Sequence, residues 1–143
     1  MVWTKAVGLM DIQLRTNRSD PLLRLRDVTR FEDGSGYRAV LEVRSRGFEV
    51  STPFYFEPRP LAEFLNQLVV MDDTLVGSAR LKPLYEDHFI ELTLISRGRI
   101  VVRGEVFEYS EHAQHLGFEF ETDQTVLKPL IDDVRECVHA PAA

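Results

Sequence analysis

Hydrophobic and polar residues alternate with a period of two along several stretches of the sequence, which is the pattern of half-buried β-strands. The apolar positions of four such stretches are Tyr37, Ala39, Leu41 and Val43; His88, Ile90, Leu92 and Leu94; Ile100, Val102 and Val106; and Leu116, Phe118 and Phe120. Glycine-containing turns at 33–36 and 97–98 connect neighbouring strands. Pro53 places its strand at a sheet edge or splits it. Apolar positions change parity near Leu9 and Met10, where we expect a bulge.

Two other segments have the spacing of amphipathic α-helices. The first is predicted to be short, and its apolar stripe follows Pro60 and comprises Leu61, Phe64, Leu65 and Leu68. The second is predicted over about 123–138, with an apolar stripe of Leu127, Leu130, Ile131, Val134 and Val138. Because Pro129 would clash with the carbonyl of Thr125, this helix either begins near Leu127 or is kinked in its first turn.

Together these elements predict an α+β fold in a single domain over residues 1–143. We expect a mainly antiparallel sheet or open sandwich of about seven strands, with both amphipathic helices on one face. With 143 residues, of which 44% are hydrophobic, the chain can bury a core without disulfides or metal. One cysteine cannot form an internal disulfide. No apolar run approaches the roughly 18 residues of a membrane span or forms a secretory signal, so we expect a cytoplasmic protein without membrane contact.

Charge is unevenly distributed along the chain. The net charge is −6, but residues 1–56 carry nine basic and seven acidic residues, whereas 57–143 carry eight and sixteen. This acidic second part would repel a phosphate backbone, and the arginines of the first part alternate with apolar residues, as on the solvated face of a sheet. We therefore predict no nucleic-acid partner. A basic protein partner suits the acidic part through electrostatic complementarity.

Residue patterns typical of catalysis are scarce. Glu111, His112 and His115 lie in a polar connection without a further spaced ligand, so we predict no metal site. Cys137 lies on the apolar stripe of the second helix, where a cysteine is usually a small buried hydrophobe and not a nucleophile. Serines and glycines match no nucleophile elbow, phosphate loop or dinucleotide fingerprint. We therefore expect no cofactor and no enzymatic activity.

An alternative class of function centres on His88. This residue follows Glu86 and Asp87, and Glu91 lies three residues further on. A hydrolase or small-ligand-binding protein could use His88 as a general base assisted by these carboxylates. The structural interpretation is a histidine at a strand end beside acids that favour its charged form. A deep pocket that converges on these side chains would favour the catalytic alternative.

Strand parity also predicts a protein-binding face. If the even-numbered apolar positions of 100–106 face the helices, aromatic and acidic residues gather on the opposite side. The predicted partner-binding residues are Phe89, Glu91, Glu105, Phe107, Tyr109, Glu119 and Glu121. Tyr and Phe are enriched in the cores of protein interfaces. Strands of the first half could instead cover Phe107 and Tyr109 as a second layer, or the face could pair with a second copy in a homodimer.

Several segments of the sequence resemble small bacterial proteins grouped with the WapI-type immunity proteins. They are PLAEFL at 60–65, EDHFIEL at 86–92, the turn at 97–98 and LGFEFETDQT at 116–125, and the resemblance covers roughly residues 37–138. It implies a non-catalytic protein that protects a cell by binding the toxic domain of a polymorphic toxin. The resemblance assigns no defined binding residue, because partner-facing positions are expected to differ with the toxin. We therefore predict a binding module that occludes a basic active surface.

Overall fold

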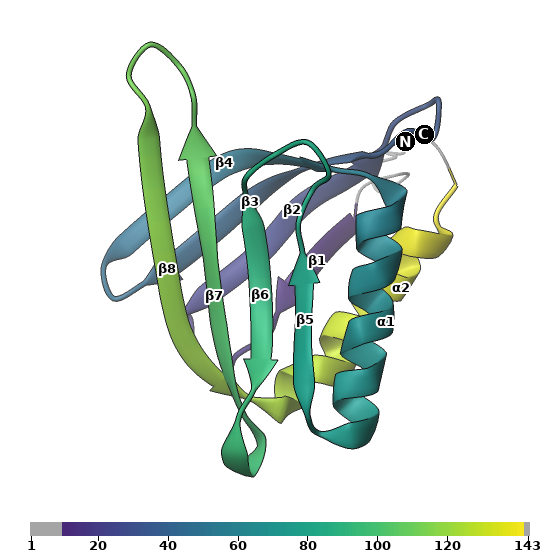
Figure 1. Cartoon of the computed structure of the whole chain (residues 1–143), viewed down its shortest axis with the longest axis vertical. Helices are drawn as coiled ribbons and strands as arrows, with labels where there is room; N and C mark the ends of the chain where they lie inside the picture. The colour runs from purple at the N-terminus through teal and green to yellow at the C-terminus, as the bar shows by residue number, and fades with distance from the viewer. Residues whose placement is uncertain (1–9, 142–143) are drawn as a thin grey trace, which may run out of the picture.

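The computed structural model describes residues 10–141, which form two four-stranded antiparallel sheets and two α-helices (Figure 1). The strands are β1 (Met10–Leu14), β2 (Leu22–Arg30), β3 (Tyr37–Ser45), β4 (Phe48–Phe56), β5 (Gly77–Leu81), β6 (Phe89–Leu94), β7 (Arg99–Glu108) and β8 (Gln114–Asp123), and the helices are α1 (Pro58–Thr74) and α2 (Leu127–His139). Strands β1 to β4 form the first sheet and β5 to β8 the second, each in chain order. The predicted α+β fold class is confirmed, with eight strands in place of about seven.

The two sheets and both helices share one hydrophobic core. Figure 1 shows the first sheet running diagonally behind the second, with α1 and α2 together along one side. Inward-facing side chains of both sheets join the apolar stripes of the helices in a single buried cluster. Helix α1 packs against edge strand β5, α2 packs against edge strand β1, and the two helices contact each other. The helices therefore close the side of the sandwich at which β1 and β5 lie. Neither is long and apolar enough to cross a membrane, within the part of the chain described.

Local expectations about the strands agree with the structure. The turns at 33–36 and 97–98 connect β2 to β3 and β6 to β7. Pro53 lies in β4, which is one of the two edge strands of the first sheet, in agreement with its missing N–H. The pairing of β1 with β2 shifts register between Met10 and Ile12, next to the predicted bulge; Leu9 lies outside the described residues.

The first helix is longer than expected and the second begins where expected. Helix α1 has 17 residues because Met71 extends its buried stripe by one turn beyond Leu68. Helix α2 begins at Leu127, after a 3₁₀ turn, so of the two alternatives the start near this residue is confirmed. Pro129 is then the third residue of the helix. A backbone N–H at this position has no partner within the helix, so proline removes no hydrogen bond there.

Close packing across the second sheet depends on Gly104, a buried residue of β7. Gly104 lies opposite Phe118 of β8 on the inner face. A Cβ atom at position 104 would collide with the backbone oxygen of Phe89 and lie 2.6 Å from Cζ of Phe118. Because the first of these neighbours is backbone, it cannot move aside cheaply. The aromatic ring thus occupies the space that any larger residue would need.

We expect Gly104→Ala to destabilise the protein by about 2 kcal/mol through overpacking. The measurement is the free energy of unfolding from urea titrations followed by circular dichroism. The matched control is Gly117→Ala in the neighbouring strand, where a Cβ atom would meet only Cγ of Glu105, at 4.0 Å. This control should change stability by less than about 0.5 kcal/mol. Equal effects of the two substitutions would contradict the proposed packing constraint.

Cys137 lies on the buried side of α2, as predicted, and its side chain is inaccessible to solvent. Burial, followed by the nearby carboxylates of Asp133 and Glu136, raises the pKa of this thiol from 9.0 to about 12. Thiolate is the reactive form of cysteine, so the native thiol is protected both by burial and by protonation.

We therefore expect a thiol reagent at pH 8 to label Cys137 only as fast as the chain unfolds. The check is the rate of labelling by Ellman's reagent with and without urea, with the unfolded chain as the rapidly labelled control. Below pH 9 the thiol is protonated in both the native and the unfolded state, so it does not make the free energy of unfolding depend on pH. Above pH 9 the unfolded state loses the thiol proton first, so the free energy of unfolding falls between pH 9 and about pH 12. Rapid stoichiometric labelling of the native protein would refute this assignment.

Candidate functional site

Strand register places the predicted partner-binding residues on one face of the second sheet. Residues paired across neighbouring strands share a face. The positions of this outer face are Ser78 and Arg80 in β5; Phe89, Glu91 and Thr93 in β6; Arg99, Val101, Arg103, Glu105 and Phe107 in β7; and His115, Gly117, Glu119, Glu121 and Asp123 in β8. Six of the seven predicted residues belong to it. The seventh, Tyr109, follows the end of β7.

The first sheet lies on the opposite side of the second sheet from this outer face. It packs against the inner face, where Leu92, Ile100 and Val102 are buried. The alternative in which strands of the first half cover Phe107 and Tyr109 is therefore wrong for the described strands β1 to β4. Tyr109 remains 62% exposed.

Arginine side chains cover the centre of the outer face. The guanidinium groups of Arg80 and Arg103 lie over the ring of Phe89, 4.5 Å and 5.3 Å from its centroid, and leave Phe89 only 7% exposed. Arg103 also forms an ion pair with Glu91, with 2.9 Å between Nη2 and Oε1. Phe89 thus lies beneath two guanidinium groups in cation–π contact with its ring. A molecule that approaches this part of the face would contact the arginines and not the ring. Strand β5 has only five residues, so its alternation is too short to predict the position of Arg80 from the sequence.

Carboxylates remain in excess on the outer face. Its five acidic residues, Glu91, Glu105, Glu119, Glu121 and Asp123, stand against the three arginines Arg80, Arg99 and Arg103, a net charge of −2. The Arg99–Glu121 pair spans 3.5 Å with both side chains 49% exposed, so it contributes little stability. Three of the five carboxylates lie on β8. Negative charge therefore concentrates along one edge strand of the sheet.

An aromatic stack extends the outer face onto the β7–β8 hairpin, which projects beyond the rest of the molecule in Figure 1. The ring of Phe107 stacks on Tyr109 at 5.6 Å and on His115 at 4.4 Å between centroids. Nε2 of His115 lies 3.3 Å from Oε1 of Glu105. The Tyr109 hydroxyl donates to Asp87 at 2.8 Å, and this hydrogen bond raises the pKa of Tyr109. Contacts on both sides thus orient an exposed aromatic surface.

The β5–β6 connection adds two exposed apolar side chains that the sequence analysis missed. Tyr85 is 86% exposed and Leu84 is 41% exposed. The backbone N–H of Leu84 donates to Glu57 at 2.9 Å, and Asp87 joins the connection to the hairpin through Tyr109. Irregular loops have no periodicity, so strand parity carried no signal for these residues.

The contacts of His88 do not match those of a general base. Its side chain is 8% exposed, and Nδ1 accepts a hydrogen bond from the backbone N–H of Phe107 at 3.0 Å. This backbone contact occupies Nδ1 and fixes the orientation of the ring. Asp87 is bound by Tyr109 and Glu91 by Arg103, so the neighbouring acids do not converge on the imidazole. The observed role of His88 is to join β6 to β7.

The candidate metal ligands are also separated. His115 belongs to the aromatic stack, whereas Glu111 and His112 lie in the exposed β7–β8 turn. Among residues 10–141, no three or more His, Cys, Asp or Glu side chains gather in a way that could hold a metal ion.

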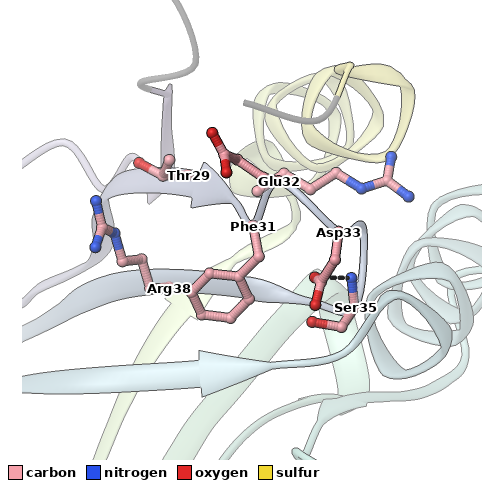
Figure 2. A pocket seen from close by; sticks show the side chains of 7 residues that line it. Thr29, Phe31, Glu32, Asp33, Ser35 and Arg38 are labelled. Atoms are coloured by element: carbon pink, nitrogen blue, oxygen red, sulfur yellow. Dashed lines mark hydrogen bonds between the residues drawn. The ribbon is translucent and has the colours of Figure 1, made fainter.

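A broad hollow of about 580 Å³ lies at the β2–β3 turn, away from the outer face. Figure 2 shows its lining side chains, which are Thr29, Arg30, Phe31, Glu32, Asp33, Ser35 and Arg38. Asp33 accepts a hydrogen bond from the N–H of Ser35 at 2.9 Å, and the contacts with Ser35 lower the pKa of Asp33. This carboxylate thus stabilises the turn.

Comparison with known proteins supports the resemblance seen in the sequence. The model of the immunity protein WapI-like family matches residues 11–141. A chain from the crystal structures of Trypanosoma bruciei MRP1/MRP2 has a similar fold, with a TM-score of 0.52 over 94% of this chain and 86% of that chain. At 12% sequence identity, this likeness concerns the fold alone. No curated protein matches the sequence. Since the family match covers nearly all of its length, the chain belongs to the immunity protein WapI-like family.

Proposed function

We propose that this chain is a non-catalytic immunity protein that inhibits a cognate bacterial toxin by covering the toxin's basic active surface. The binding surface is the outer face of the second sheet together with Tyr109. One observation carries the proposal: this face combines an ordered, solvent-exposed aromatic stack with an excess of carboxylates. Membership of an immunity protein family supplies a toxin as the class of partner.

The aromatic stack suits the role of an interface anchor. Tyr109 has a large exposed surface and is oriented by Phe107 and Asp87 before any partner arrives. Little side-chain entropy is therefore lost when it is buried, and aromatic residues at the centre of an interface often dominate its binding energy. This arrangement gives the complex its residence time.

Excess negative charge suits the role of steering. Exposed carboxylates on β8 raise the rate at which a basic surface encounters this face. The exposed pair of Arg99 and Glu121 is weak enough for Glu121 to exchange its partner for a basic group of the toxin. Occlusion of an active site requires no reactive group, in keeping with the burial of Cys137 and the hydrogen-bonded Nδ1 of His88.

Charge reversal by Glu119→Lys combined with Glu121→Lys should slow association with the toxic domain of the cognate toxin. We expect the association rate to fall about tenfold or more at low salt, with little change in dissociation, because steering acts before contact. Stopped-flow fluorescence at several salt concentrations measures this effect, and added salt should shrink it. The matched control is Glu32→Lys combined with Glu49→Lys. It changes the net charge by the same amount, but at two positions outside the second sheet. Association rates independent of salt, or equal slowing by the control, would exclude steering by the outer face.

Truncation by Tyr109→Ala should instead accelerate dissociation of the same complex about tenfold, because it removes an anchor from the interface. Tyr109→Phe keeps the ring and loses only the hydrogen bond to Asp87, so its effect should be smaller. Surface plasmon resonance gives the dissociation rates, and survival of cells that express the toxin tests protection. Unchanged dissociation of the Tyr109→Ala complex would remove the hairpin from the binding surface.

A further inference from the structure

We infer that the free edge of β8 is a docking site for an extended segment of the toxin, which adds to the second sheet as a further strand. This inference rests on the function proposed above and identifies the part of the toxin that the outer face receives. The incoming strand carries basic side chains on one side and apolar side chains on the other.

Strand β8 differs from the other three edge strands of the described fold. Edge strand β5 is packed against α1, and β1 is packed against α2. Edge strand β4 contains Pro53, which blocks regular pairing. Strand β8 has ten residues, contains no proline and pairs with β7 alone. A long edge of this kind offers backbone N–H and C=O groups to another strand.

An apolar groove accompanies this edge. It has a volume of about 240 Å³ and is lined by Val43, Ser45, Arg46, Phe48, Leu116, Gly117, Phe118 and Glu119, between β8 and the β3–β4 turn. Phe48 is 70% exposed, and Leu116 and Phe118 are only partly buried. Since an apolar cavity of about 150 Å³ takes up benzene, the groove can receive a leucine or phenylalanine side chain. The inner side of an added strand would face this groove.

Charge specifies the other side of the added strand. Glu119, Glu121 and Asp123 occupy the outer side of β8 at alternate positions. Side chains of a neighbouring strand would lie about 5 Å from them, where basic residues are favoured and acidic ones are not. A second copy of β8 would bring the same three carboxylates, on a chain whose net charge is −6. The occupant is therefore a basic toxin segment and not another copy of this chain.

In strand addition, the backbone and the side chains contribute differently to binding. Main-chain hydrogen bonds along β8 supply affinity, whereas the groove and the carboxylate row select a sequence that alternates apolar and basic residues. Gly117 has no side chain at the centre of the edge and is exposed, so the partner's backbone can approach closely there. The added strand also continues the outer face outward, beside Glu119 and Glu121.

Residue-resolved amide hydrogen exchange, measured by NMR with and without the toxic domain of the cognate toxin, tests this inference. In the free protein, outward-pointing amides of 114–123 should exchange fast, and in the complex they should slow about 100-fold or more. Amides of β4, the other uncovered edge, are the internal control and should not change. Protection of β8 in the free protein together with a dimeric mass would mean that a second copy occupies the edge, and would overturn the inference.

Failure of the inference and failure of the proposed function give different results. If a complex forms, depends on Glu119 and Glu121, and leaves the β8 amides exchanging fast, the face binds the toxin but the edge does not. If no complex forms, both proposals fail.

The groove is tested by Phe48→Ala, which should raise the Kd about tenfold. The control is Tyr55→Ala on the same strand; Tyr55 is 48% exposed, and its substitution should leave the Kd unchanged. Equal effects of these two substitutions would remove the groove from the docking site.

Discussion

Burial of the inner face of the second sheet is the interaction on which the rest of the structure depends. A sheet gains stability from the side chains that it removes from water, and here the inner face of the second sheet joins the first sheet and both helices in one buried cluster. Phe118 lies directly over Gly104 within this layer. Because the described elements outside the second sheet pack on its inner side or along its β5 edge, no described strand or helix covers the outer face.

The outer face is ordered without being locked by strong internal contacts. Its Arg99–Glu121 ion pair is half-exposed and weak, so it does not hold these two side chains in one arrangement. Its aromatic residues, in contrast, are fixed by stacking and by the hydrogen bond between Tyr109 and Asp87. Rigid aromatic anchors among exchangeable charges are a suitable basis for recognition without catalysis, and the chain's place in an immunity protein family is consistent with that basis.

The arrangement of the sheet edges links the fold to the proposed mechanism. Two edges are covered by helices and one contains a proline, which leaves β8 as the edge that is long, acidic and beside an apolar groove. The similarity to the MRP1/MRP2 structures at 12% identity shows that this double-sheet architecture accommodates very different sequences. What the architecture does in this chain is therefore decided by its surface residues.

The sequence by itself determined which residues share a face, because side chains alternate strictly along a strand: Glu105 and Phe107 had to lie opposite Val106. From the chemistry of proline it also left two alternatives at each of two sites, an edge or a split strand at Pro53 and a helix start near Leu127 or a kinked first turn at Pro129, and the structure shows the first of each pair. Only the tertiary structure decided that the strands form two sheets, that Arg80 and Arg103 cover Phe89, and that Nδ1 of His88 binds the N–H of Phe107. These contacts join residues distant in the chain, and local periodicity holds no information about which distant residues meet.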